Sequence, residues 1–356
     1  MNRERNIKQI RLKEFGVKGQ YSLEKSSVLV VGAGGLGIPV CQYLNAMGIG
    51  TLGIIDGDVI EMSNLHRQPL YEPDTIGLSK VHVLRSCLNR QNPDTDIRIY
   101  ETFLGFENAL DILKNYQLII DATDNLTTRY LIDDAALILN IPWIYGALHG
   151  FEGQVSVFNY NHGPTYRCLF PDLPNAGEIP DCNTMGTLGV LPGIIGNLQA
   201  LEAVKVIAGL PGILSGKVLM YNGLDQEIRQ LKIKKNPNRS IPNAELKPNT
   251  FVCDSASAGI MPEHWIQHIN NGARTCIVDV REPEEFKADH LYGAVNIPLL
   301  ELRNRLDEIP TEKHVLLVCK SGPRSIQAYR FIQNMSQNIQ SNWLIGGLTA
   351  YRKKNL

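Results

Sequence analysis

The chain has 356 residues, of which 44% are hydrophobic, and this length and composition suffice for two globular domains. Lys and Arg number 35 against 36 Asp and Glu, a balance that argues against a protein that binds nucleic acid or membranes through its overall charge. The N-terminal stretch MNRERNIKQIRLKEF has no apolar run typical of a signal peptide, so we expect a cytoplasmic protein whose seven cysteines are thiols.

The first strong signal is an apolar strand at 28–31 that runs into GAGGLG and then into a helical pattern. Four glycines form this turn: Gly32, Gly34, Gly35 and Gly37. Their spacing lets backbone N–H groups at the start of a helix approach phosphate oxygens. The next strand, 51–56, ends in Asp56, whose carboxylate can accept hydrogen bonds from ribose hydroxyls. The unit is therefore predicted to bind a nucleotide, which the glycines alone do not identify.

The segments that follow favour a triphosphate over a nicotinamide dinucleotide. SNLHRQ supplies Arg67 and GLSK supplies Lys80, and two cations suit a triphosphate better than one pyrophosphate bridge. The strand in LIIDATDN ends with Asp121 and Asp124, at the sheet edge where open α/β sheets bind ligands. Because Mg²⁺ takes one or two carboxylates together with phosphate oxygens, we expect Asp124 to hold it.

The rest of the chain separates into two domains. Strands alternate with helices over residues 1–235, which predicts a doubly wound, Rossmann-like α/β domain with antiparallel strands added at one edge. The apolar segment 188–210 carries polar residues at helical spacing, so it is predicted to be a buried helix. Residues 236–258 include a stretch rich in Pro and Asn and are predicted to be a linker, and 259–356 form a second, small α/β domain.

GAGGLG, IIDGD, SNLHRQ, GLSK and DATDN, in this order, resemble the MoeB/ThiF-type adenylyltransferases, which are relatives of ubiquitin-activating enzymes. The resemblance covers residues 1–235. It implies a homodimer that uses ATP to adenylate the C-terminal glycine of a small ubiquitin-like sulfur-carrier protein ending in Gly-Gly. It also implies that Asp56 holds the ribose, that the phosphates are contacted by Asn64, Arg67 and Lys80, and that Asp124 serves the metal.

Two departures from this family pattern stand out. The family has a structural zinc on two C-x-x-C pairs, but TYRC places Thr165 where one thiol belongs and leaves only Cys168, and the second pair, expected near 236–243, is missing. One thiolate cannot hold a tetrahedral zinc ion, so we predict no zinc. The family's R-x-x-R-Q, which reaches the ATP of a partner subunit, is RNIKQ here, and Lys8 keeps the charge without the bidentate geometry.

The loop PDLPNAGEIPDCNTMGTLGVLPG contains Cys182 at the position where relatives carry a conserved thiol. Two interpretations remain open. Cys182 forms a thioester, an acyl persulfide or a mixed disulfide during sulfur transfer, or it is a spectator in the loop, because thiol reactivity depends on the surroundings.

In the second domain, the strand HVLLVC delivers Cys319 to the loop CKSGPRS, which contains Arg324. Backbone N–H groups and a following helix, together with Arg324, should stabilise the Cys319 thiolate and an anion beside it. Tyrosine phosphatases and rhodaneses both use such a loop, but this C-x₄-R spacing fits one extra sulfur better than a phosphoryl group. VDVREPEEF, HLYGAVNIPL and GGLTAY resemble rhodanese domains, an inactive docking rhodanese being the alternative, and we expect Asp279 and Arg281 to brace the loop.

Together the domains predict a two-step reaction, in which ATP and the carrier give an acyl adenylate and a persulfide on Cys319 then attacks it to give a thiocarboxylate. The sulfur would come from thiosulfate or a cysteine desulfurase. Carriers for molybdopterin, thiamine and tRNA thiolation are not distinguished. The alternatives are a nicotinamide-dependent oxidoreductase with a regulatory rhodanese domain, a relative of tRNA-modifying dehydratases that adenylates RNA, and a non-catalytic carrier-binding scaffold.

Overall fold

The computed structural model describes residues 4–171, 186–236, 246, 259–262, 264–265, 275–310, 314–335 and 339–355. The chain divides into two compact units, Met1–Lys247 and Pro248–Leu356.

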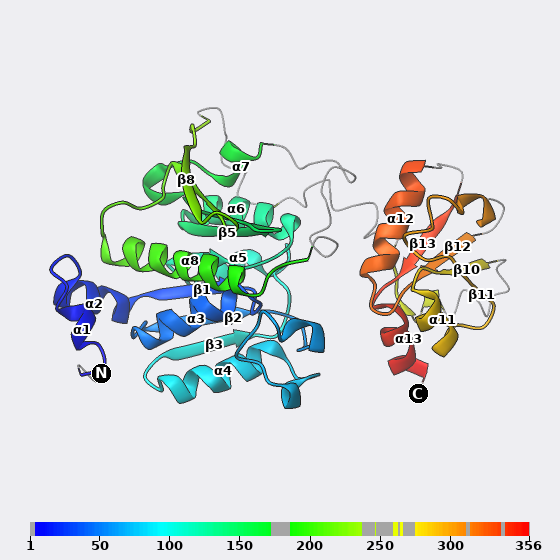
Figure 1. Ribbon diagram of the computed structural model, residues 1–356, viewed down its shortest axis with the longest axis horizontal. Helices are drawn as coiled ribbons and strands as arrows, with labels where there is room; N and C mark the ends of the chain where they lie inside the picture. Colours follow the sequence, from blue (N-terminus) through cyan, green and yellow to red (C-terminus); the bar gives the residue numbers. More distant parts are fainter. Residues whose placement is uncertain are drawn as a thin grey trace. The chain divides into compact units, whose positions relative to one another are not determined.

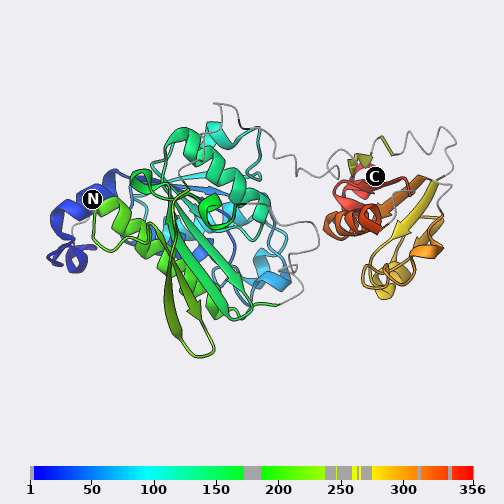
Figure 2. The ribbon, with the colours of Figure 1, turned by 90° about the horizontal axis from the view of Figure 1, so that it is seen from above.

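The first unit is built on an eight-stranded sheet in the order β3-β2-β1-β4-β5-β6-β7-β8 (Figure 1). Its strands are β1 Ser27–Val31, β2 Thr51–Ile55, β3 Asp96–Tyr100, β4 Leu118–Asp121, β5 Trp143–His149, β6 Glu152–Phe158, β7 Lys217–Asn222 and β8 Glu227–Lys232. The pairs from β3 to β5 are parallel and those from β5 to β8 are antiparallel, so the predicted mixed sheet is confirmed. The β7–β8 hairpin forms one edge (Figure 2).

The described helices of this unit are α1 Ile7–Ile10, α2 Gly16–Lys25, α3 Gly37–Ala46, η1 Met62–Asn64, η2 Pro73–Thr75, α4 Lys80–Gln91, α5 Ala109–Leu113, α6 Leu126–Leu139, η3 Tyr160–His162, α7 Tyr166–Leu169 and α8 Val190–Ala208. Successive side chains of β1 point to opposite faces of the sheet. Val28 and Val30 join a cluster that includes residues of α3, α4 and α8, whereas Leu29 and Val31 join one that includes residues of α5 and α6. Helices therefore cover both faces, which confirms the doubly wound fold.

In the described part of the chain, α8 is the one helix long and apolar enough to cross a membrane, with half of its most apolar window buried. It packs against α3 and β5. The Glu202 carboxylate accepts the Leu214 N–H at 2.9 Å and pairs with Lys205, so these two charged residues of the helix have partners inside the fold. The helix thus belongs to the core of the first unit.

The second unit has a parallel five-stranded sheet in the order β11-β10-β12-β13-β9. Its strands are β9 Gly259–Ile260, β10 Thr275–Asp279, β11 Ala294–Asn296, β12 His314–Val318 and β13 Ser341–Leu344, and its described helices are α11 Pro283–Ala288, η4 Leu306–Glu308, α12 Pro323–Met335 and α13 Gly347–Asn355. β12 is buried at its centre, and its carboxyl end leads directly into Cys319. The sheet therefore brings this thiol to the edge where parallel sheets hold their ligands.

Candidate functional site

The glycine turn, residues 32–37, joins β1 to α3 and requires glycine at both ends. Gly32 has a φ of +106°, and a Cβ there would lie 2.6 Å from the carbonyl oxygen of Ala122. A Cβ on Gly37 would lie 1.9 Å from the carbonyl oxygen of Gly32. Side chains at these two positions would push the backbone apart, so glycine keeps the start of α3 close to β1 and β4.

Asp56, just after β2, is tied to this turn. Its Oδ2 accepts the N–H of Ala33 at 2.7 Å and its Oδ1 accepts the N–H of Asp58 at 2.8 Å. Burial raises the pKa of Asp56, and Lys80 and the two N–H groups oppose that rise. Each carboxylate oxygen has a second lone pair, so hydroxyl groups of a bound ligand can still donate to it.

The other predicted residues of this site, Asn64, Arg67 and Lys80, follow β2 in the chain, and Lys80 comes last. Lys80 begins α4, is buried, and holds its Nζ 2.9 Å from Asp58 Oδ2, whose side chain is 55% exposed. The hydroxyl of Tyr71 donates to the carbonyl of Ala33 at 2.8 Å and lies 3.3 Å from the carbonyl of Lys80, which ties the start of α4 to the glycine turn. Lys80 is therefore a buried cation beside the turn.

Arg67 and Asn64 lie on the short loop that crosses this region. A Cβ on Gly35 would lie 3.2 Å from the carbonyl oxygen of Arg67, so the loop packs directly on the glycine turn. The Arg67 guanidinium is half-buried and donates to the Ser63 carbonyl at 2.8 Å. Asn64 is buried, and its amide oxygen accepts the Glu61 N–H at 3.2 Å. Both side chains thus support their own loop.

The two acids that follow β4 have different surroundings. Asp121 is fully buried, bonded to Arg129 Nε at 3.2 Å and to the hydroxyl of Thr123 at 2.6 Å, and burial raises its pKa. Asp124 is exposed at the same strand end, which adjoins the glycine turn through Ala122. Asp121 thus braces the loop, and Asp124 is the carboxylate available to a solvent-borne cation such as Mg²⁺, whose preference for oxygen ligands it fits.

Two residues that were not predicted from the sequence, Arg129 and Gln199, hydrogen-bond to the carboxyl end of β4. Arg129 Nη2 donates to the carbonyl of Thr123 at 3.0 Å and lies 3.4 Å from that of Gly146, and the guanidinium sits 5.3 Å from the ring centre of Tyr145. Gln199 on α8 donates to the backbone carbonyl of Asp121 at 2.6 Å. The only sequence signal for Arg129 is a cation in the helix that follows an acidic strand end.

Lys8 lies apart from this group. Lys8 is exposed on α1, whose Gln9 donates to the carbonyl of Met47, just past the C-terminal end of α3. The glycine turn lies at the other end of α3, about 15 Å away for a ten-residue helix. The chain therefore does not bring Lys8 to its own glycine turn. Cys182 lies outside the described residues.

The two segments that carry cysteine pairs in the family do meet, but without a zinc-binding set. Cys168 Sγ accepts the N–H of Thr165 and the N–H of Asn236, each at 3.4 Å, and lies 3.5 Å from the Thr165 hydroxyl. Among the described residues no three His, Cys, Asp or Glu side chains gather as a metal site. One thiol and one hydroxyl do not fit tetrahedral zinc.

In the second unit, Cys319 opens the Cys319 loop, residues 319–324. Its side chain is 1% exposed, and its Sγ accepts the N–H of Gly322 at 3.1 Å and lies 3.5 Å from the Ser325 hydroxyl. The outer side of the loop is held by α13, because the N–H of Leu348 donates to the Cys319 carbonyl at 2.9 Å.

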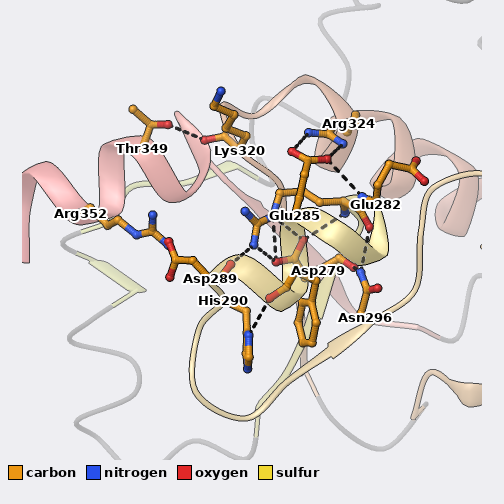
Figure 3. Close-up of polar contacts among 12 residues, drawn as sticks. Asp279, Glu282, Glu285, Asp289, His290, Asn296, Lys320, Arg324, Thr349 and Arg352 are labelled. Carbon is orange, nitrogen blue, oxygen red and sulfur yellow. Dashed lines mark hydrogen bonds and ion pairs between the residues drawn. The ribbon is translucent and has the colours of Figure 1, made fainter.

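Thr349 holds the next carbonyl of the loop. Its N–H and its hydroxyl both donate to the Lys320 carbonyl, at 3.0 and 2.8 Å (Figure 3). With these carbonyls held outside, an N–H group of the loop can face the sulfur, the arrangement that stabilises a thiolate or persulfide.

Arg324 has a partner that the sequence analysis did not name. Its Nη1 lies 2.6 Å from Glu285 Oε2 and its Nη2 lies 2.8 Å from Oε1, a bidentate pair in which each side chain is about one-third exposed (Figure 3). The hydrogen bonds from Arg324 lower the pKa of Glu285 to about 2. In the described part of the chain, no hydrogen bond joins the guanidinium to Cys319.

The pair expected to brace the Cys319 loop is formed, but its further side-chain hydrogen bond goes to another segment. Asp279 and Arg281 form a buried bidentate pair, with Nη2 2.7 Å and Nε 3.0 Å from the carboxylate oxygens. Arg281 Nη2 also donates to the Asp289 carbonyl at 2.6 Å, which secures the segment around α11.

Comparison with known proteins agrees with both halves of this arrangement. Residues 7–243 match the ThiF family and residues 261–354 match the rhodanese-like domain. The chain is 37% identical to "Adenylyltransferase and sulfurtransferase MOCS3" of Drosophila sechellia, a match that covers 98% of this chain and 82% of that protein. It is 36% identical to "Probable adenylyltransferase/sulfurtransferase MoeZ" of Mycobacterium tuberculosis, over 96% of this chain and 90% of that protein.

Two other similarities are informative. "Probable molybdopterin-synthase adenylyltransferase" of Porphyra purpurea is 39% identical, with 98% of this chain and 92% of that protein covered. Among solved structures, E. coli MccB with ATP superposes with a TM-score of 0.57 at 20% identity, covering 63% of this chain and 68% of that one. This last similarity establishes the fold alone.

Proposed function

The chain belongs to the ThiF family and has a rhodanese-like domain after the ThiF region, and from this premise we propose that it converts the C-terminal glycine of a ubiquitin-like carrier into a thiocarboxylate. It is an adenylyltransferase and sulfurtransferase that uses ATP to adenylate a sulfur carrier and transfers sulfur through its rhodanese-like domain. Because one relative is named for molybdopterin synthase, we propose that the carrier is the small subunit of that enzyme, ending in Gly-Gly.

In the first step, the glycine carboxylate of the carrier attacks the α-phosphorus of ATP and the bond to pyrophosphate breaks. Negative charge then grows on the phosphate oxygens, where Lys80 and Arg67 stabilise it. The ribose hydroxyls donate to Asp56, and N–H groups of the glycine turn approach the phosphates. A magnesium ion held by Asp124, when bound, would neutralise phosphate charge. Buried Lys80 beside the turn supports this assignment.

In the second step, the outer sulfur of a persulfide on Cys319 attacks the carbonyl carbon of the acyl adenylate and AMP leaves. This gives an acyl disulfide between Cys319 and the carrier. A second thiol then attacks the Cys319 sulfur, takes it into a new disulfide and releases the thiocarboxylate with the electron pair. We assign that thiol to Cys182. The observation that carries the proposal is the Gly322 N–H directed at the buried Cys319 sulfur.

The experiment that tests the proposal separates the two steps. In Cys319→Ala, carrier-dependent exchange of labelled pyrophosphate into ATP should remain within about twofold of wild type, because adenylation needs no thiol. Formation of the thiocarboxylate, measured by mass spectrometry of the carrier, should be lost. Cys276→Ala, a matched change on β10, should keep both activities. Loss of exchange and thiocarboxylate together in Cys319→Ala would contradict this division of labour.

We also propose that the protein is a cytoplasmic homodimer without zinc. The position of Lys8 supports the dimer, since Lys8 could reach an ATP only in another copy of the chain. The hydrogen bond from the N–H of Asn236 to Cys168 supplies a metal-free link between the two segments. Sedimentation of the purified chain and its metal content by mass spectrometry test these points.

A further inference from the structure

The carboxylate that holds Arg324 has no role in the reaction as derived so far. Glu285 lies in the first turn of α11 and engages both terminal nitrogens of the guanidinium, at 2.6 and 2.8 Å. Its Oε2 also accepts the N–H of Glu282 at 3.2 Å, a bond within the capping box of α11 (Figure 3). The carboxylate is therefore positioned by its own helix as well as by the arginine.

This pair changes the charge that the Cys319 loop presents to a sulfur donor. A guanidinium that donates two hydrogen bonds to one carboxylate has fewer N–H groups left for another anion. The negative charge of the carboxylate also offsets its positive charge. Glu285 remains ionised at neutral pH because its pKa lies at about 2. The described loop then offers an incoming donor the N–H of Gly322 and the exposed Lys320, but little of the positive charge of Arg324.

We propose that Glu285 sets the class of sulfur donor, so that the Cys319 loop selects a persulfide over thiosulfate. This inference rests on the proposed function, because it concerns the reaction that loads Cys319. Glu285 acts as a positioning residue through Arg324.

The two loading reactions differ in the charge that the loop must hold. With thiosulfate, the Cys319 thiolate attacks the outer sulfur, the sulfur–sulfur bond breaks, and sulfite leaves with the electron pair. The donor and its leaving group are both dianions, so a second available cation besides Lys320 would stabilise them. With a persulfide R–S–SH, the thiolate attacks the outer sulfur and R–S⁻ leaves, so at most one negative charge is present on the donor sulfurs. A loop whose arginine is already neutralised therefore disfavours the first reaction more than the second.

The test is the rate of persulfide formation on Cys319 in the full chain, followed by mass spectrometry of the Cys319 peptide with either thiosulfate or cysteine persulfide as donor. Glu285→Gln keeps an amide oxygen for the Glu282 N–H and removes the charge. We expect its rate constant with thiosulfate to rise about tenfold, the scale of one charge-assisted hydrogen bond, and its rate with cysteine persulfide to stay within about twofold. Glu284→Gln removes the same charge from an exposed position on the same helix and should change neither rate.

An unchanged thiosulfate rate in Glu285→Gln, or an equal gain with both donors, would overturn the inference. If Glu285→Gln loses both reactions, the same rates are measured in Glu285→Asp. Its shorter side chain weakens the pair with Arg324 but keeps the negative charge. A selective gain with thiosulfate then supports the inference, and no gain overturns it. If wild type accepts sulfur from neither donor, the sulfur-transfer function itself fails, which is distinct from a failure of donor selection.

Discussion

Each unit of the chain holds a cation against a carboxylate at its site, but the two pairs differ in exposure and geometry. In the first, Lys80 is buried while Asp58 is 55% exposed and joined by one contact at 2.9 Å. In the second, Arg324 and Glu285 are exposed to a similar extent, 33% and 34%, and are joined by two hydrogen bonds. One contact to an exposed carboxylate leaves Lys80 less firmly held than two hydrogen bonds leave Arg324. We propose that the first pair leaves its lysine available to an anionic ligand, whereas the second keeps its arginine from one.

The largest expected effect concerns Lys80. In Lys80→Ala, carrier-dependent pyrophosphate exchange should fall about 10²- to 10³-fold, the usual cost of removing one group that stabilises growing charge. Lys18→Ala, an exposed lysine on α2, should leave the exchange unchanged. A fall of less than about threefold in Lys80→Ala would mean that this buried cation does not serve the phosphates, and the comparison of the two pairs would lose its basis.

Neutralising the partner of Lys80 should have a smaller effect. In Asp58→Asn, the KM for ATP in the exchange reaction should change by no more than about threefold, because a half-exposed carboxylate competes weakly with a triphosphate. This contrasts with the tenfold gain expected for Glu285→Gln with thiosulfate. Equal effects of the two substitutions would show that exposure and bidentate geometry do not separate the pairs.

The smallest effect is on stability. Because Glu285 and Arg324 are partly exposed, Glu285→Gln should lower the free energy of unfolding by less than about 1 kcal/mol at pH 7. The pKa of Glu285 is depressed, from 4.5 to about 2, so this contribution is present above pH 4.5 and declines as the pH falls toward 2. Calorimetric unfolding of wild type and Glu285→Gln across this pH range measures the difference in unfolding free energy. A difference that grows as the pH falls would contradict the prediction.

The sequence predicted the parts of both sites that are local in the chain. The glycine turn, Asp56 at the strand end and Cys319 after β12 follow from spacing, because neighbouring residues fix their geometry. The missed residues act across long separations: Glu285 lies 39 residues from Arg324, and Gln199 lies 78 residues from Asp121. Such contacts depend on which strands are adjacent, and one sequence does not report this for individual side chains.

The sequence also identified some residues of the sites without identifying their contacts. The sequence offered Asp124 for the metal but no role for Asp121, and the burial of Asp121 beside Arg129 identifies it as a brace. Arg324 was expected to serve the thiolate, but its direct hydrogen bonds in the described structure go to Glu285.

A transfer of labelled sulfur tests whether the two units act in series on one carrier. The chain is loaded with radioactive sulfur as a persulfide on Cys319, freed of donor, and mixed with the carrier in the presence or absence of ATP and magnesium. If the units act in series, label reaches the carrier's C-terminal thiocarboxylate only when ATP is present. Label that stays on the chain with ATP, or reaches the carrier equally without it, would contradict the coupling of adenylation to sulfur transfer.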